Sequence, residues 1–183
     1  MNYIVFDLEL NSKPFKNRHP NEIIEIGAVK LDENRNFIDE FQSFVRPKVY
    51  RKLFSIVRNK TGIVQGDLDG AESFKTAVAR FREWLGEDFL LITWGHDDIH
   101  HFKTNCKFNH VSSGWVNNCL DVQKQFSKIC GLPAGQVSSL KNALEFLHIG
   151  VEEDLHRAGV DAKYTAEIFT RIFDRVDSGV NRH

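Results

Sequence analysis

The chain has 183 residues, of which 42% are hydrophobic and 27% are charged, and its formal net charge is -1. This composition argues against a disordered protein, and the near-neutral charge argues against one that coats long duplex nucleic acid by bulk electrostatics. The length fits one globular domain, which we place at residues 1–177, followed by a short C-terminal tail at 178–183.

The cysteines and the apolar segments point to a reducing, aqueous compartment. The three cysteines, Cys106, Cys119 and Cys130, are odd in number and have no C-x-x-C spacing, which favours free thiols. No apolar run approaches the roughly 18 residues that span a bilayer, and the N-terminus lacks the basic start and the cleavage site of a signal peptide. We therefore expect a cytoplasmic protein.

The first predicted element is a strand at residues 3–11, YIVFDLELN. Because side chains alternate between the two faces of a strand, Asp7 and Glu9 lie on the same face as Tyr3 and Val5. This face therefore changes from apolar to acidic towards the carboxyl end of the strand. Ligands of open α/β sheets bind beyond the carboxyl ends of the strands, so the two acids mark a candidate site.

The following segments alternate between strand and helix patterns. Two strand-like runs at 22–31 and 37–47 are joined by the turn-rich DENRN, which predicts an antiparallel pair beside the first strand. The remaining predicted elements are a helix at 73–85, a buried strand at 88–95, a helix at 97–108, a short strand within 115–122, and helices at 138–150 and 160–176. This order predicts an α/β domain with a mixed sheet.

Two further segments bring acids to the same rim. Asp97 and Asp98 follow the strand at 88–95, and Asp161 lies on or beside the protein-facing stripe of the last helix. Each position alone has an ordinary explanation, such as a surface turn or an ion pair. Four acids on one rim repel one another unless cations neutralise them, and carboxylate oxygens select hard divalent ions such as Mg2+. The combination therefore predicts a metal site.

His156 precedes Asp161 by five residues, a separation that does not place two side chains on one helix face. We therefore place His156 in the loop that leads into the last helix. With an unperturbed pKa of about 6.5, a histidine can accept a proton from water at neutral pH, as a hydrolase requires. A structural role is the alternative for an isolated histidine.

Taken together, these segments resemble a known enzyme family. FDLEL, the aspartate of WGHDD, and HRAGVD occur in the order and at the separations of the DnaQ-like 3'-5' exonucleases with four acids and a histidine, the DEDDh group. EIIEIGAV, FVRP, KTGIVQGDLDGAESF, TWG and NCKFNHV are similar to the branch that holds the ERI-1-type exoribonucleases and the bacterial sporulation inhibitor KapD. The resemblance spans nearly the whole chain.

The resemblance implies an RNase H-like fold with a five-stranded mixed sheet flanked by helices. It implies that Glu9 also orients the attacking water and that His156 is the general base. It further implies release of nucleoside 5'-monophosphates from the 3' end of single-stranded nucleic acid, with RNA favoured over DNA. Two Mg2+ or Mn2+ ions would be held by the four acids, Asp7, Glu9, Asp98 and Asp161.

The third acid is assigned to Asp98 because this branch carries the pattern W-G-x-x-D, which starts here at Trp94. The preceding residue, Asp97, stands where the family commonly has an apolar residue. Lys60 likewise replaces a usually apolar residue in the KTGI segment. Both positions depart from the family pattern at the predicted site.

Substrate contacts are predicted in two segments. Residues 45–60 include Arg51 and Lys52 among six cations, with no acid and with aromatic residues between them, which is typical of a single-strand contact surface. A solvated loop and helix face is the alternative. The second segment resembles the family's pocket for the terminal nucleotide and comprises Leu10, Thr61, Gly62 and Ile63.

Two other functional classes stay open. His96 and His100 would share a helix face, as in the metal-dependent HD phosphohydrolases, but those enzymes are all-helical and this segment follows a strand. A nuclease-like regulatory binding protein is the second class, because the resemblance to KapD includes a regulatory role. Nothing in the sequence demands more than a monomer, and a regulatory protein partner fits the second class.

Overall fold

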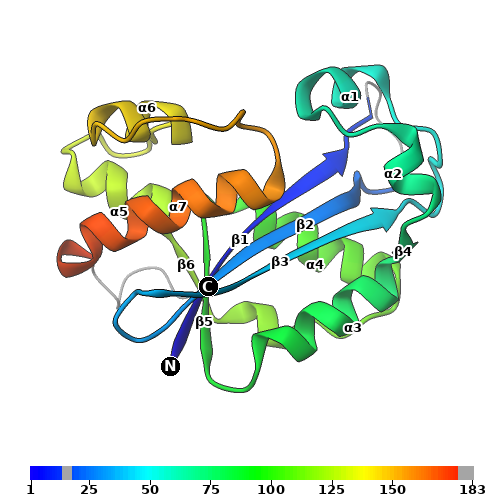
Figure 1. Cartoon of the computed structure of the whole chain (residues 1–183), viewed down its shortest axis with the longest axis horizontal. Coiled ribbons are helices and arrows are strands. Elements are labelled where there is room, and N and C mark those ends of the chain that lie inside the picture. Colours follow the sequence, from blue (N-terminus) through cyan, green and yellow to red (C-terminus); the bar gives the residue numbers. More distant parts are fainter. Residues whose placement is uncertain (14–17, 177–183) are drawn as a thin grey trace.

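The computed structural model describes residues 1–13 and 18–176, so the predicted tail at 178–183 lies outside the described residues. The described strands form one mixed sheet in the order β4-β3-β2-β1-β5-β6 (Figure 1). They are β1 (Asn2–Asn11), β2 (Glu22–Leu31), β3 (Phe37–Arg46), β4 (Glu72–Ser73), β5 (Phe89–Thr93) and β6 (Cys119–Asp121).

The pairing of the strands follows the predicted pattern. β1, β2 and β3 pair in antiparallel fashion, as the two runs joined by DENRN predict, whereas β5 and β6 add in parallel beside β1. The sheet has one strand more than the five expected, because β4 pairs in parallel with the end of β3. A strand of two residues is too short to produce a recognisable alternation in the sequence.

The helices include all four that the sequence predicts. The helices at 73–85, 97–108, 138–150 and 160–176 correspond to α3, α4, α6 and α7, although α7 begins earlier and ends in a 3-10 turn at Phe173–Arg175. Three further short helices, α1, α2 and α5, were not predicted from the sequence. The helices are α1 (Ser55–Thr61), α2 (Gln65–Asp69), α3 (Phe74–Leu85), α4 (Asp97–Phe108), α5 (Val122–Ile129), α6 (Leu140–Phe146) and α7 (Ala158–Ile172), with a 3-10 turn at Gly114–Asn117.

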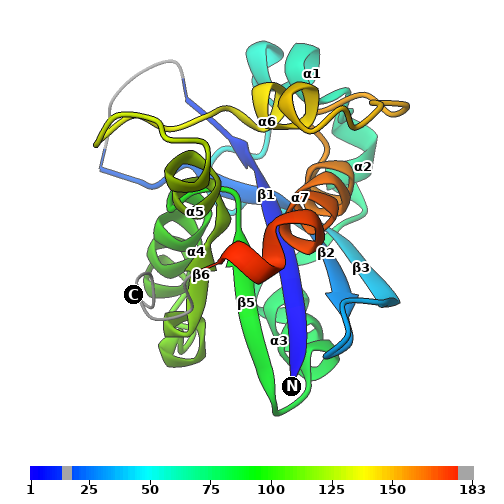
Figure 2. The same cartoon turned by 90° about the vertical axis from the view of Figure 1, so that its left-hand side faces the viewer.

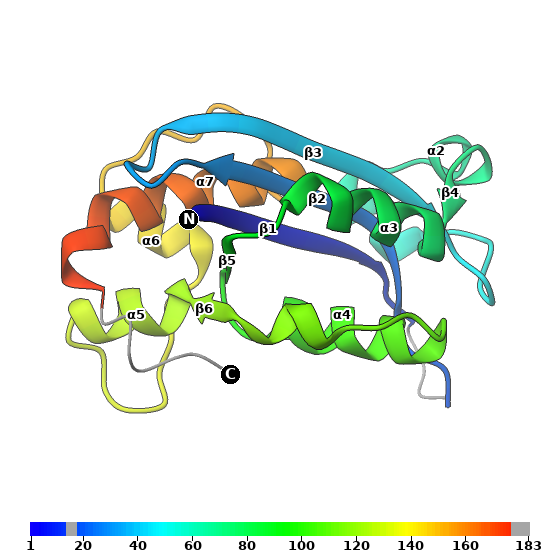
Figure 3. The same ribbon diagram turned by 90° about the horizontal axis from the view of Figure 1, so that it is seen from below.

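Helices cover both faces of the sheet (Figures 1, 2 and 3), so β1 is buried on both sides. Ile4 and Phe6 pack in an apolar cluster with α3 and α4, whereas Val5 packs in a second cluster with α5, α6 and α7. This mixed α/β class is the one predicted, and it excludes the all-helical HD phosphohydrolase alternative. Asp7 and Glu9 share the face of Val5, so they point towards α7.

The cysteines and the helices can be compared with the predictions made for thiols and for membrane spans. The three cysteines are free thiols, and Cys106 and Cys119 are buried. In the described part of the chain, no helix is long and apolar enough to cross a bilayer.

Candidate active site

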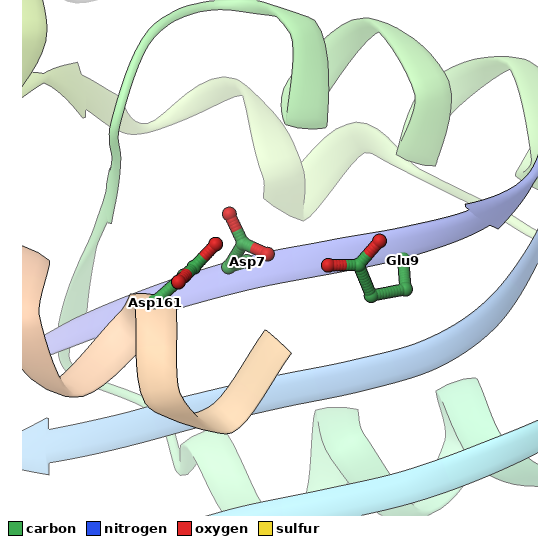
Figure 4. Close-up of side chains that lie close together, drawn as sticks. All are labelled: Asp7, Glu9 and Asp161. Atoms are coloured by element: carbon green, nitrogen blue, oxygen red, sulfur yellow. The ribbon is translucent and has the colours of Figure 1, made fainter. Parts of the chain in front are cut away.

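Three carboxylates from two elements converge at the carboxyl half of β1. Asp7 and Glu9 project from β1, and Asp161 projects from the first turn of α7 towards them (Figure 4). Each residue offers a carboxylate oxygen, and these three oxygens lie within 4.8 Å of one another. Residues that are about 150 positions apart in the sequence thus share one site.

A glycine on β2 allows α7 to lie this close to the sheet. Gly27 pairs with Asp7 across the β1–β2 ladder. A Cβ atom at Gly27 would lie 2.1 Å from the backbone nitrogen of Gly159 and 2.2 Å from the carbonyl carbon of Ala158, which is sterically impossible. The absence of a side chain at Gly27 therefore brings the start of α7, and with it Asp161, to Asp7.

A buried ion pair fixes the same end of α7. Glu25 lies opposite Glu9 on β2 and is 0% exposed. Its carboxylate accepts hydrogen bonds from Nη2 and Nε of Arg157, at 2.8 and 3.2 Å, and from the backbone N–H of Ala158 at 3.3 Å. Sequence reasoning missed this pair, because a Glu and an Arg more than 130 residues apart show no pattern. An acid within the apolar run EIIEIGAV was the available signal.

His156 lies immediately before α7, in the loop where the sequence places it. Its side chain is exposed, and its backbone N–H donates to both carboxylate oxygens of Asp161, at 3.2 and 3.3 Å. Its φ angle of 76° is in the left-handed region, which non-glycine residues rarely adopt. The main chain of His156 therefore orients Asp161, and the imidazole remains available to a ligand at the site.

The two neighbouring aspartates at the start of α4 differ in their surroundings. The side chain of Asp97 is 95% exposed and lies 3.6 Å from Nδ1 of His96. Asp98 is partly buried, is hydrogen-bonded to the backbone of Leu8 on β1, and is the nearby charge with the largest effect on the pKa of Asp7. The charge of Asp98 therefore acts on Asp7, whereas Asp97 faces solvent. Among the described residues, the group of acids whose oxygens lie within 4.8 Å of one another consists of Asp7, Glu9 and Asp161 and does not include Asp98.

Burial and mutual repulsion make the ionised form of these acids unfavourable. Burial raises the pKa of Asp7 well above its ordinary value, and the charges of Asp98, Asp161 and Glu9 raise it further. Burial raises the pKa of Glu9 to about 8, against the opposing charge of Lys60, and burial raises the pKa of Asp98 to about 7. Burial also raises the pKa of Asp161, opposed by the backbone N–H of His156.

This donor set fits hard divalent cations. Carboxylate oxygens are the ligands that Mg2+ and Mn2+ prefer, and a cation between the carboxylates would remove the repulsion that raises their pKa values. No neighbouring cation side chain already does so: among the described residues, none of the three clustered acids has a Lys or Arg nitrogen within 4 Å. The acidic cluster therefore has the composition and spacing of a metal site.

A hollow of about 330 Å3 opens beside Glu9, between the end of β1 and α1. Its lining includes Lys60 and two of the four residues predicted for the nucleotide pocket, Leu10 and Thr61. The other two predicted residues do not line it. Gly62 ends α1 in the left-handed conformation, and the side chain of Ile63 is fully buried.

A buried asparagine attaches the basic segment to the end of β1. Asn11 is 1% exposed; its Nδ2 donates to the carbonyl oxygens of Tyr50 and Lys52, and its Oδ1 accepts from the N–H of Phe54. The main chain of residues 50–54 is thereby held next to the acids. Of the two predicted substrate contacts in this segment, Lys52 is exposed and Arg51 lines a separate hollow, described below.

The sequence model of the exonuclease family matches residues 4–169, a range that contains the acidic cluster, Asp98 and His156. The chain belongs to the exonuclease family. The predicted resemblance to the DEDDh exonucleases is thereby confirmed, and the relatives of this exonuclease domain agree with it.

Three curated relatives span different protein contexts. The PolC-type DNA polymerase III of Clostridium perfringens is 29% identical over 182 residues, which are 99% of this chain and 12% of that protein. KapD of Bacillus subtilis, named a probable 3'-5' exonuclease, is 31% identical over 111 residues, 60% of this chain and 54% of that protein. Human ERI1 exoribonuclease 3 is 27% identical over 161 residues, 81% of this chain and 47% of that protein. The exonuclease domain therefore spans about half or less of the length of these relatives.

A solved structure shows the same fold. The nuclease domain of 3'hExo, described as a DEDDh family member bound to rAMP, superposes with a TM-score of 0.86 at 22% identity. The superposition covers 94% of this chain and 92% of that chain. The RNase H-like fold predicted for the exonuclease domain is therefore confirmed.

Proposed function

We propose that this exonuclease domain, residues 1–177, is a metal-dependent 3'-5' exonuclease that releases nucleoside 5'-monophosphates from single-stranded nucleic acid. It acts as a cytoplasmic monomer and favours RNA over DNA. The observation that carries the proposal is the convergence of Asp7, Glu9 and Asp161, whose carboxylate oxygens lie within 4.8 Å of one another. Such a cluster at the carboxyl end of a central strand suits phosphodiester hydrolysis, in which negative charge must be neutralised.

Asp7, Glu9 and Asp161 would hold two Mg2+ or Mn2+ ions, with Asp98 completing the set from the start of α4. When bound, such ions would supply a lower pKa for the attacking water and charge stabilisation for the leaving 3' oxygen. Glu9 would also orient the attacking water. The choice of Mg2+ or Mn2+ is supported by the donor set, which consists of oxygen atoms, since softer metals select nitrogen and sulfur ligands.

His156 would accept the proton of the attacking water. Two observations support this role: the side chain of His156 is exposed, and its backbone N–H donates to Asp161, one of the clustered acids. A neutral imidazole is a general base of the kind that this hydrolysis requires. The proton would then pass from the imidazole to solvent.

The hollow beside Glu9 would take the 3'-terminal nucleotide. Leu10 and Ile56 supply apolar surface for a base, and Lys60 supplies a positive charge beside the acids. Upstream nucleotides would follow the basic segment, including Arg51 and Lys52. Reversing the charge of both residues to Glu should weaken strand binding and flatten its salt dependence; an unchanged salt titration would contradict this contact.

The preference for RNA is supported by the relatives that are named exoribonucleases and by the rAMP in the 3'hExo structure, whereas PolC is named for DNA synthesis. The deciding experiment is a time course on matched 5'-labelled RNA and DNA strands with Mg2+, Mn2+ or EDTA, with Asp7→Asn as the control variant. A metal-dependent ladder that shortens from the 3' end, faster for RNA and absent in Asp7→Asn, is the expected result.

Three outcomes would change the proposal. Equal rates on both strands would remove the RNA preference. Cleavage that persists in EDTA or in Asp7→Asn would remove the metal site as the catalytic centre. No cleavage of either strand, with strand binding intact, would favour a regulatory binding protein.

A further inference from the structure

A second hollow, of about 280 Å3, is lined by residues at the end of β3 and at the start of α3. Its floor includes Ile23, Val45 and Phe74, which belong to the apolar cluster on the α3 and α4 face of the sheet. The acidic cluster faces α7, so the two sites lie on opposite faces. We call this hollow the basic pocket, because its lining includes four cations, Arg46, Lys48, Arg51 and Lys75.

The charges of the four cations are not offset by carboxylate partners in the part of the chain that the structure describes. In the described ranges 1–13 and 18–176, none of them has a carboxylate oxygen within 4 Å. Glu22 also lines the basic pocket, but its side chain is buried and already accepts hydrogen bonds from the backbone N–H groups of residues 48–50, at 2.5 to 3.2 Å. Four positive charges around one engaged carboxylate create a local positive potential that attracts anions.

The polar groups of the basic pocket point to a phosphate as the ligand. The amide of Asn105 is engaged with the carbonyl oxygens of Asn21 and His101 and with the N–H of Ile23, so the cations are the main donors that remain. Guanidinium and ammonium groups bind phosphate strongly. A volume of about 280 Å3 is near the lower limit of about 300 Å3 for small-molecule sites, which suits one phosphate and part of its nucleotide.

We propose that the basic pocket binds a backbone phosphate of the substrate strand, upstream of the end that is cleaved. This inference rests on the proposed exonuclease function. It is supported by a continuous basic segment between the two sites: Arg51 lines the basic pocket, and Lys60 lines the hollow beside Glu9. Residues 46–60 contain six cations and no acid. The strand therefore passes round the end of the sheet, along this segment.

The inference predicts that strand length matters for turnover. We would measure kcat/KM for single strands of about four and about sixteen nucleotides, the range of sites seen for single-strand binding domains. The variant is Lys75→Gln, and the matched control is Lys141→Gln. Both lysines are exposed and occupy the second position of a helix whose N-cap is a serine, Ser73 for α3 and Ser139 for α6.

We expect Lys75→Gln to lower the ratio of kcat/KM on the long strand to that on the short strand by about three- to tenfold, and Lys141→Gln to leave it unchanged. Arg46→Gln should act in the same way as Lys75→Gln. The slope of log affinity against log salt for the long strand should fall in magnitude by about 0.7 for each lost phosphate contact. Ratios and slopes equal to those of the wild-type protein in both variants would overturn the inference.

Two further readouts separate this inference from the proposed function and from a free ligand. Long-strand binding by fluorescence anisotropy, in an Asp7→Asn background, tests the basic pocket even if the wild-type protein cleaves neither strand. If Lys75→Gln weakens inhibition by inorganic phosphate or a nucleoside 5'-monophosphate while the length ratio is unchanged, the basic pocket holds a small free phosphate and the strand proposal is wrong.

Discussion

The backbone N–H of His156 donates to both carboxylate oxygens of Asp161, at 3.2 and 3.3 Å. The contact uses the main chain, so the imidazole takes no part in it. The main chain of His156 also adopts a left-handed conformation, with φ at 76°. The backbone of His156 thus orients Asp161, whereas its side chain carries the proton-transfer role that we propose, so the two contributions can be separated by substitution.

Replacing the imidazole should therefore remove turnover without removing metal binding. We expect His156→Asn to lower kcat by about 100-fold and to leave Mg2+ affinity within about twofold, because asparagine tolerates the left-handed conformation. Single-turnover cleavage and calorimetric Mg2+ titration measure the two effects. His148→Asn is the control, since His148 is an exposed histidine with φ at 54°. A fully active His156→Asn would contradict the proton-transfer role.

The two aspartates at the start of α4 should behave differently. Asp98→Asn should lower kcat/KM by about 100-fold or more, because it removes a negative charge that acts on Asp7 and that the proposed metal site would use. Asp97→Asn should stay within about threefold of the wild-type value, since an exposed charge interacts weakly. Steady-state kinetics on a labelled strand compares them. The reverse order of effects would assign the third acid to Asp97.

Gly27 should not tolerate a side chain. Gly27→Ala would place a Cβ atom 2.1 Å from the backbone nitrogen of Gly159, so α7 must move and the protein should lose about 3 kcal/mol or more of unfolding free energy. Gly66→Ala is the control, because a Cβ there meets nothing within 4 Å and alanine favours its helix. Urea denaturation measures both. Equal stability of the two variants would show that α7 does not need this close approach.

The ion pair between Arg157 and Glu25 should matter far more than a surface pair of the same chemistry. Arg157→Leu leaves the fully buried Glu25 without its cation and should cost about 3–5 kcal/mol of unfolding free energy. Arg171→Leu removes the partner of Glu167 on the exposed side of α7 and one hydrogen bond to the carbonyl oxygen of Leu147, and should cost about 1 kcal/mol or less. Thermal and urea unfolding test this. Similar losses of unfolding free energy in the two variants would show that the pair of Arg157 and Glu25 does not hold the start of α7 in place.

The raised pKa values predict how stability changes with pH in the absence of metal. The pKa of Glu9 is about 8 in the folded protein, against an ordinary value of 4.5, so the folded state binds its proton more tightly than the unfolded state. The contribution of Glu9 to the free energy of unfolding is therefore most favourable below about pH 4.5, and it is lost as the pH rises to about 8. The Tm of the wild-type protein in EDTA should fall relative to that of Glu9→Gln over this range.

Mg2+ should reverse this loss at pH 8, because it binds the deprotonated carboxylates of the folded protein. The corresponding measurement is the Tm of the wild-type protein and of Glu9→Gln with and without Mg2+, at pH 5 and pH 8. Identical pH profiles of the two proteins in EDTA would show that Glu9 does not carry the pH dependence. A Tm unaffected by Mg2+ at pH 8 would argue against metal binding at the acidic cluster.

Local patterns in the sequence were sufficient for most of the fold. Alternation over 3–11 and the turn-rich link between 31 and 37 predicted the antiparallel core strands, since strand periodicity depends on neighbouring residues alone. The acids of β1 and α7 and the loop position of His156 were also predicted from periodicity. Assigning a reaction to them needed the resemblance to the DEDDh exonucleases, because a pair of acids on a strand is compatible with many functions.

Only the tertiary structure decided how these residues meet. The approach of α7 to Gly27, the burial of Glu25 against Arg157, and the attachment of residues 50–54 to Asn11 all join segments that lie far apart in the sequence. The tertiary structure also distinguishes Asp97 from Asp98, because Asp97 is exposed whereas Asp98 contacts the backbone of Leu8 on β1. Such contacts depend on packing across the whole molecule, whereas a sequence pattern reports only the geometry of a few consecutive turns or strand residues.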